Sequence, residues 1–293
     1  YPLVTGVQTC ALPISVGPKI QRLFELCKRY PTTTFSCLTD HLDAASAIGA
    51  FFHQHQSSMD VYVDLNIGMN RTGILPDTTA VDLIENIVAT SGITYKGLHA
   101  YDGQHRQVDF AEREAACEKQ FEQVYQLKEK LKSKGIDTGA IIAGGSPSFS
   151  IHCKRSDRIC SPGTNIFWDK GYATICAEQE FEPAVKVLTR VISKPAANKI
   201  CIDLGHKAIA SENELAKRIF FPYHPFLKPV SQSEEHLVFE VDDSNVFKIG
   251  DLLIGIPYHI CPTVALHESL YEVQKEKVTG EWKVAARKRK IHI

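Results

Sequence analysis

The chain has 293 residues, of which 44% are hydrophobic and 23% charged, and its formal net charge is −1. This balance is that of an ordinary globular protein and argues against nucleic acid or an anionic membrane as the main partner. No apolar run approaches the roughly 20 residues that span a bilayer. The nine cysteines form no CxxC pair, which predicts reduced thiols and a cytoplasmic setting.

The first residues differ from the rest of the chain. Residues 4–14, VTGVQTCALPI, show no amphipathic period and no helix cap, and they match the translation of a common sequencing-library adapter. We therefore expect residues 1–15 to be an artefact that takes no part in the fold. On this interpretation the chain lacks its natural N-terminus, together with the first one to three βα units.

From residue 16 onward, helices and strands are predicted to alternate. Ile20, Leu23, Phe24 and Cys27 have the spacing of one helix face. Strands are expected at 33–38, 61–67, 95–100 and 139–143, and further helices at 40–52, 79–90 and 109–134. Alternation at this spacing is typical of βαβ units and predicts a parallel sheet.

After about residue 178 the pattern changes. Short apolar runs at 184–193, 199–203, 236–239, 252–256 and 269–274 are separated by polar turns, with no long helix between them. This predicts a second, mostly antiparallel β-domain. The expected domains are therefore residues 16–182 and 183–293.

Polar residues follow three of the predicted parallel strands. Arg71 follows the strand at 61–67, Tyr101 follows the next, and Gly144, Gly145 and Ser146 follow the one at 139–143. The carboxyl ends of parallel strands share one face of a barrel. Gly-Gly-Ser there would offer unblocked backbone N–H groups and a hydroxyl, which suit a phosphate. The alternative is a set of ordinary turns with a solvated arginine.

His259 and Cys261 form a candidate metal pair within the segment PYHICPT. Two residues apart on an extended strand, their side chains would point to the same side. Imidazole and thiolate together suit Zn²⁺, and two protein ligands leave positions for water or substrate. The alternative is a core cysteine beside a surface histidine.

Seven segments, taken in order, resemble one enzyme family. They are DLNIGMNRTG, GLHAYDG, AGGSPS, SPGTNIFWDKGY, IDLGHKAIASE, SEEHLVFE and IPYHICPTVALH. They resemble the fold-type III pyridoxal-phosphate enzymes of the D-threonine aldolase and eukaryotic-type D-serine dehydratase family. The resemblance covers nearly everything from residue 16 on. It implies an α/β fold: an incomplete (β/α)8 TIM-type barrel, alanine racemase-like, followed by a mostly antiparallel β-domain.

The resemblance also implies roles for individual residues. Arg71 and Tyr101 would lie beside pyridoxal 5'-phosphate, and Gly144, Gly145 and Ser146 would hold its phosphate. His259 and Cys261 would bind a divalent metal, zinc by their chemistry, next to the substrate hydroxyl. The full-length enzyme would be a head-to-tail homodimer.

One residue of the family is not matched. The lysine that forms the Schiff base with the cofactor lies, in such enzymes, at the end of the first barrel strand, and no residue of this chain corresponds to it. Lys19, at a helix start, and Lys207, in the turn GHKAIAS, are not assigned this role. The chain is therefore expected to be inactive by itself.

The implied activity is that of a lyase on small D-3-hydroxy amino acids. Elimination of water, releasing ammonia and a 2-oxo acid, is favoured because the dehydratases resemble this chain in having His-x-Cys, whereas the aldolases more often have His-x-Asp. Retro-aldol cleavage to glycine and an aldehyde is the alternative. An amino-acid racemase and a non-catalytic pyridoxal-phosphate-binding protein also stay open.

Overall fold

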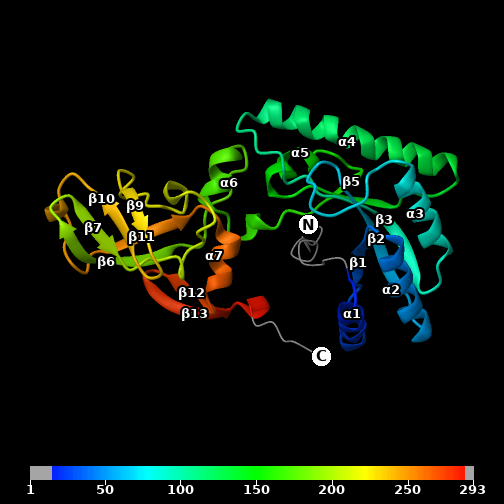
Figure 1. Cartoon of the computed structure of the whole chain (residues 1–293), viewed down its shortest axis with the longest axis horizontal. Coiled ribbons are helices and arrows are strands. Elements are labelled where there is room, and N and C mark those ends of the chain that lie inside the picture. Colours follow the sequence, from blue (N-terminus) through cyan, green and yellow to red (C-terminus); the bar gives the residue numbers. More distant parts are fainter. Residues whose placement is uncertain (1–14, 288–293) are drawn as a thin grey trace. The chain divides into compact units, whose positions relative to one another are not determined.

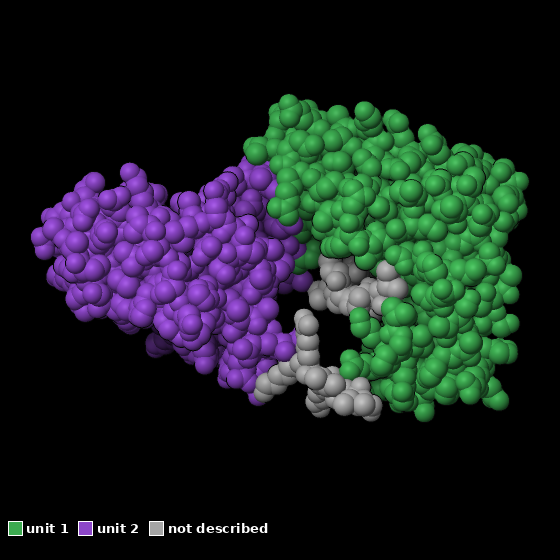
Figure 2. Space-filling model, in the orientation of Figure 1, with its two compact units in different colours: residues 1–163, 292–293 green, residues 164–291 purple. Residues whose placement is uncertain are grey.

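The structure is a computed structural model that describes residues 15–287. Of residues 1–15, expected to be an artefact, residues 1–14 lie outside the described residues, and Ser15 is buried. The chain divides between residues 163 and 164 into two compact units, unit 1 and unit 2 (Figure 2). Within residues 15–287, no helix is long and apolar enough to cross a membrane. The cysteines in the same range form no disulfide with one another.

Unit 1 is a parallel five-stranded sheet with its helices alongside (Figure 1). Its elements are α1 (Pro18–Arg29), β1 (Ser36–Thr39), α2 (Leu42–Gln54), β2 (Met59–Leu65), α3 (Thr78–Ala89), β3 (Ile93–Ala100), α4 (Phe110–Ser133), β4 (Ala140–Ala143), η2 (Ser146–Ser148), α5 (Phe149–His152) and β5 (Arg158–Cys160). The strands neighbour one another in chain order, β1-β2-β3-β4-β5, and every pair is parallel. Sequential parallel strands joined by helices are how the wall of an α/β barrel is built.

The core of unit 1 lies between the sheet and these helices. Val61 and Val63 of β2 are fully buried, which is why this strand reads as a nearly continuous apolar run. Ile20 and Leu23 of α1 are buried in the same cluster, which confirms the predicted helix face. The predicted α/β architecture of this unit is therefore confirmed.

Unit 2 is built mainly of antiparallel strands. Its elements are η3 (Thr164–Ile166), α6 (Lys170–Ile175), β6 (Val187–Ala196), β7 (Lys199–Ile202), η4 (Leu215–Lys217), β8 (Ile219–Phe220), β9 (Lys228–Gln232), β10 (Leu237–Glu240), η5 (Ser244–Val246), β11 (Leu252–Pro257), α7 (Ile260–Leu266), β12 (Ser269–Gln274), β13 (Lys277–Lys283) and η6 (Ala285–Arg287). Six strands form one sheet in the order β8-β11-β6-β7-β10-β9, and β12 pairs with β13. The predicted second β-domain is confirmed in kind.

The division between the units falls earlier than the expected boundary at residue 183. Trp168 is fully buried and packs against Tyr172 and Phe181, with ring centroids 5.5 and 5.2 Å apart. Asp169 caps α6 and also accepts the N–H of Ile260 at 3.0 Å. The ring contacts hold residues 168–181 together, and the bond from Ile260 ties this segment to the start of α7. The sequence does not show this bond because it joins segments 91 residues apart.

Candidate functional site

Three loops of unit 1 meet at the carboxyl ends of β2, β3 and β4. The guanidinium carbon of Arg71 lies 4.5 Å from the centroid of the Tyr101 ring. A Cβ on Gly145 would come within 2.6 Å of the same ring, so only a glycine allows this approach. Arg71 is exposed and Tyr101 half-buried. The structure therefore brings Arg71, Tyr101 and Gly145 together, as the strand-end pattern predicted.

Two acidic side chains, one of them buried, hold the loop that carries Arg71. Asp64, near the end of β2, accepts the hydroxyl of Thr72 at 2.7 Å and pairs with His99 of β3 at 2.6 Å. Asp40 accepts the N–H of Gly73 at 2.8 Å. Gly73 has φ +101°, and a Cβ there would lie 2.5 Å from the backbone of the β2 end, so this turn needs glycine. These bonds therefore fix the turn immediately after Arg71.

The Gly-Gly-Ser loop after β4 differs from its predicted form. The N–H of Gly144 donates to the carbonyl of Ala100 at 3.0 Å, and the N–H of Gly145 donates to the hydroxyl of Ser148 at 3.2 Å. The prediction that these two N–H groups are unblocked is wrong, because each is already bonded within the protein, one to the end of β3 and the other to Ser148. Ser146, buried and at the start of η2, stands at the turn between them and the helix.

The residues present still fit a phosphorylated cofactor. Arg71 brings a cation, and Tyr101 a flat aromatic surface with a hydroxyl. The missing Cβ of Gly145 leaves room for close approach to that surface. Cationic and hydroxyl donors at a strand end are what a phosphate needs. The fit rests on Arg71, Tyr101 and Ser146 more than on the two glycine N–H groups.

Behind the Gly-Gly-Ser loop lies a buried polar cluster that the sequence did not predict. Asp102 accepts the hydroxyl of Ser148, and its other oxygen lies 2.7 Å from Nε2 of His152. Nδ1 of His152 lies 2.6 Å from a guanidinium nitrogen of Arg158. Asp102, His152 and Ser148 have no exposed surface. An aspartate beside Tyr101 was visible in the sequence, but its partners lie 46 to 56 residues away in the chain.

The charge of Asp102 is stabilised despite its burial. Burial raises the pKa of this carboxyl, but hydrogen bonds from His152 and Ser148 outweigh burial and hold the pKa below its usual value. His105 and Cys117 bring a nitrogen and a sulfur to within 4.8 Å of the Asp102 oxygen, a donor set of the kind that zinc accepts. Burial, followed by the charge of Asp102, raises the pKa of the Cys117 thiol. The protonated thiol is therefore favoured, and this group is held together by hydrogen bonds.

In unit 2, His259 and Cys261 lie at the start of a helix and not on an extended strand. Strand β11 ends at Pro257, His259 is the N-cap of α7, and Cys261 lies in the first turn of that helix. The extended geometry predicted for the pair is therefore wrong, because Cys261 has already entered the helix. The sulfur of Cys261 lies 3.8 Å from the hydroxyl of Thr164.

The two side chains nevertheless interact, and a third residue joins them. A hydrogen bond with Cys261 is the main cause that raises the pKa of His259 to about 9, and a bond with Glu212 adds to it. Nδ1 of His259 lies 2.5 Å from the Glu212 carboxylate. A carboxylate behind a histidine is the usual outer partner of a zinc ligand, since it fixes the ring orientation. The nitrogen of His259 and the sulfur of Cys261 are therefore a donor pair that fits a divalent metal, with Glu212 as the outer partner of the histidine.

The two lysines considered for a Schiff base lie elsewhere. Lys19 is exposed near the start of α1. Lys207 is exposed in unit 2 and pairs with Glu234 at 2.7 Å and Glu235 at 2.9 Å. Both positions agree with leaving them unassigned.

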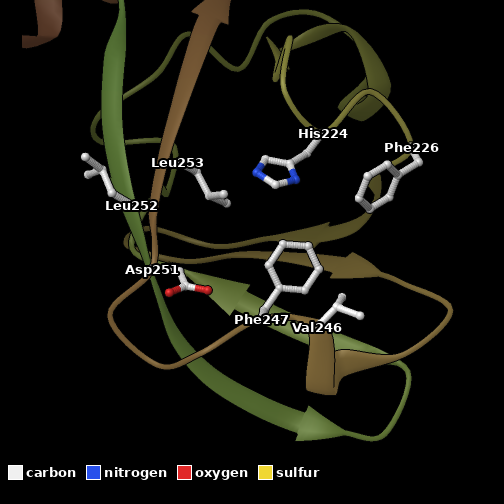
Figure 3. A pocket seen from close by; sticks show the side chains of 7 residues that line it. All are labelled: His224, Phe226, Val246, Phe247, Asp251, Leu252 and Leu253. Atoms are coloured by element: carbon white, nitrogen blue, oxygen red, sulfur yellow. The ribbon is translucent and has the colours of Figure 1, made fainter.

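Unit 2 also has a cavity of about 310 Å³ that contains no predicted site residue. The rings of His224, Phe226 and Phe247 gather along it, opposite Asp251 (Figure 3). The centroid of the His224 ring lies 5.8 Å from that of Phe226 and 5.6 Å from that of Phe247. The cavity lies at the start of β11, whereas His259 follows the end of that strand.

The chain combines two units of different kinds. Unit 1 is a parallel α/β unit with an arginine, a tyrosine and a glycine-rich loop at its strand ends, and unit 2 is a β-unit with a His–Cys pair. This combination is that of a class of cofactor-dependent enzyme folds. Residues 21–170 match the alanine racemase N-terminal domain, and residues 184–273 match a model described as "Putative serine dehydratase domain". The chain belongs to the family of the alanine racemase N-terminal domain. Its resemblance to the D-threonine aldolase and D-serine dehydratase group is confirmed.

Individual relatives carry two kinds of name. The 3-hydroxy-D-aspartate aldolase of Paracoccus denitrificans (strain Pd 1222) is 28% identical over 280 residues, which cover 92% of this chain and 70% of the relative. The D-threo-3-hydroxyaspartate dehydratase of Delftia sp. (strain HT23) is 24% identical over 253 residues, 78% of this chain and 66% of the relative. The crystal structure of D-threonine aldolase from Filomicrobium marinum superimposes with a TM-score of 0.83 at 24% identity, covering 93% of this chain and 74% of that one.

Proposed function

We propose that the chain belongs to a pyridoxal-phosphate- and divalent-metal-dependent lyase that acts on D-3-hydroxy amino acids, by D-serine dehydratase-like elimination of water. The single observation that carries this proposal is the pairing of His259 with both Cys261 and Glu212. A racemase needs no metal, so a built metal pair favours a lyase. The names of the relatives, aldolases and a dehydratase, support the same reaction class.

In this proposal the strand-end loops of unit 1 hold the cofactor. Pyridoxal phosphate supplies an electron sink for the bonds to the α-carbon of an amino acid. Arg71 brings positive charge to the site, and Tyr101 presents its ring beside that charge. Gly144 and Gly145 shape the loop, and Ser146 contributes a hydroxyl for the phosphate.

His259 and Cys261 hold the metal in unit 2. A divalent metal, zinc by the chemistry of these donors, supplies Lewis acidity toward the 3-hydroxyl group of the substrate. With Nδ1 of His259 bonded to Glu212, Nε2 is the nitrogen that would hold the metal. The soft thiolate distinguishes this pair from the harder His-x-Asp of most aldolases, which is why the dehydratase reaction is preferred.

The aldolase reaction is the second candidate. It is favoured by the name of the relative with 28% identity, a 3-hydroxy-D-aspartate aldolase. The two reactions start from the same substrate class and differ in the bond that breaks, Cβ–O in the dehydratase and Cα–Cβ in the aldolase. The products therefore separate them directly.

The test is product analysis with D-serine, D-threonine and D-threo-3-hydroxyaspartate. Because the resemblance places the Schiff-base lysine on a strand that no residue of this chain matches, the assay uses the chain extended at residue 16 by that strand, with the unextended chain in parallel. Release of ammonia and a 2-oxo acid supports the proposal. Glycine with an aldehyde establishes the aldolase instead, and racemised substrate without cleavage refutes both. The extended enzyme is proposed to be a head-to-tail homodimer, which sedimentation measures.

A further inference from the structure

The buried cluster behind the Gly-Gly-Ser loop has a single consistent set of hydrogen-bond directions. Arginine has donors and no acceptor, so Arg158 must donate to Nδ1 of His152. The ring proton of His152 is then on Nε2, which donates to Asp102. Asp102 also accepts the proton of Ser148, which leaves the lone pairs of the Ser148 oxygen for the N–H of Gly145. These hydrogen bonds form one continuous chain, here called the relay, from Arg158 through His152, Asp102 and Ser148 to the N–H of Gly145.

Each end of this relay is anchored. Arg158 of β5 also donates to the hydroxyl of Tyr125 at 2.7 Å and stacks on Phe121 of α4, with 3.9 Å between the guanidinium carbon and the ring centroid. At the other end, Gly144 has φ +74°, and a Cβ there would lie 2.5 Å from the His152 ring. The loop therefore rests directly on His152.

We infer that Asp102, His152 and Ser148 are positioning residues that set the phosphate affinity of the Gly144–Ser146 loop from behind, without touching the ligand. The inference rests on the proposed function, because it assumes that this loop receives the cofactor phosphate. Its basis is geometric: the N–H of Gly145 is turned inward to Ser148, so the direction in which the loop presents Ser146 depends on Asp102.

The cluster is not a hydrolytic triad. In such a triad the serine would bond to the histidine, whereas here Ser148 and His152 each bond to a different oxygen of Asp102. None of the three side chains is exposed to a substrate. The side-chain polar atoms of Asp102, Ser148 and His152 are all hydrogen-bonded inside this network. A buried hydrogen-bonded network of this kind rigidifies its surroundings, and that is the property a phosphate loop requires.

The test compares two ligands that differ only in the phosphate. Pyridoxine 5'-phosphate and pyridoxine have no aldehyde, so neither forms a Schiff base with any lysine. Their dissociation constants for the unextended chain, measured by calorimetry, yield a preference ratio that reports the phosphate contacts alone. Ser148→Ala is expected to lower this ratio about tenfold, which corresponds to the net contribution of roughly one hydrogen bond.

His152 provides a rescue pair. His152→Ala removes both bonds of the relay and is expected to lower the ratio at least as much as Ser148→Ala. His152→Gln keeps one donor for Asp102 and one acceptor for Arg158, so we expect it to recover most of the ratio. His152→Leu has a similar volume but no donor or acceptor, so it should stay as low as His152→Ala. If the loss of volume alone matters, His152→Leu recovers the ratio as well as His152→Gln does, which contradicts the inference.

Tyr95→Phe is the matched control. Its hydroxyl donates to the carbonyl of Thr138 at 3.0 Å, a single internal hydrogen bond away from the strand ends that carry the loop. It should lower stability without changing the ratio. Two outcomes overturn the inference but leave the proposed cofactor site standing. One is a preference ratio that is unchanged in both Ser148→Ala and His152→Ala, and the other is a ratio that falls equally in Tyr95→Phe. If Ser148→Ala does not fold, the preference ratios of the His152 variants test the inference in its place. No preference for the phosphorylated ligand in the native chain overturns the proposed cofactor site as well.

Discussion

The same chemical pair, a carboxylate and an imidazole, occurs in both units in opposite surroundings. In unit 1, Asp102 and His152 lie 2.7 Å apart and both side chains are completely buried. In unit 2, Glu212 and His259 lie 2.5 Å apart, and 46% and 40% of their side-chain surfaces are exposed. The buried pair has its lone pairs and protons committed inside the protein. The exposed pair keeps one nitrogen of His259 for a ligand.

The difference separates positioning from binding. A buried hydrogen bond between a carboxylate and an imidazole is costly to break, because removal of one partner leaves the other polar group buried without compensation. An exposed pair contributes little to stability because water screens and replaces it. We therefore expect variants of the first pair to act through folding and loop geometry, and variants of the second to act through metal affinity.

The largest effect is expected for Asp102→Ala. It leaves the donors of His152 and Ser148 unpaired in a buried site, so the free energy of unfolding should fall by about 3–5 kcal/mol. Glu212→Ala should cost less than about 1 kcal/mol. Urea unfolding followed by far-UV circular dichroism measures both. Trp168 and Trp282 lie in unit 2, so their fluorescence shows whether the loss is confined to unit 1. Equal losses in the two variants would remove the distinction.

Cys261→Ala is expected to weaken zinc binding more than about a hundredfold, because it removes a ligand and not an outer partner. Equilibrium dialysis against a zinc buffer measures the affinity. The matched control is Cys117→Ala, which removes the buried thiol beside Asp102 and His105 and should leave zinc affinity unchanged. If Cys117→Ala loses the metal and Cys261→Ala keeps it, the metal site is in unit 1.

Asp102 is also expected to make stability depend on pH. Its pKa is lowered in the folded chain, so its contribution is fully present above the unfolded value of about 3.9 and is lost as the pH falls through the lower folded value. Asp102→Asn should flatten this dependence by about 1–3 kcal/mol. Burial also lowers the pKa of His105, so both proteins should lose stability as the pH falls below about 6.5, a separate and higher range. Parallel curves for native and Asp102→Asn below about pH 4 would contradict the assignment.

The smallest effect is expected for Glu212→Gln. The amide still reaches Nδ1 of His259 but carries no charge, so zinc affinity should fall about tenfold and remain measurable. Titration with a competing chelator gives the value. A loss as large as that of Cys261→Ala would mean that Glu212 is itself a ligand.

Most of the fold was predictable from local patterns. The apolar runs of β2, β3 and β4 and the capped helices α3 and α4 were found within a few residues. Buried strands leave apolar runs in the sequence, and helices with one buried face leave a helical period. Short elements such as β5 and α7 were missed. Three or seven residues are too few to show a period.

Only the residues in the loops at the strand ends of the candidate site were predictable. Arg71, Tyr101 and Gly145 lie in the loops that follow β2, β3 and β4, so their convergence follows from the rule that parallel strands end on one face. The hydrogen-bond partners of the site residues from distant parts of the chain were not predictable. Glu212 lies 47 residues before His259, and nothing in the spacing of the two marks them as partners.

The sequence by itself determined the order of elements, the two kinds of sheet and the residues that gather at the strand ends, since all of these follow from hydrophobic period and turn chemistry. Only the tertiary structure decided which polar groups are buried together. Asp102, Ser148, His152 and Arg158 come from different elements and loops, and each is an ordinary polar residue in its own segment. Their hydrogen bonds form only when the sheet and α4 exclude water from the same place, because a buried polar group must find its partner within the protein.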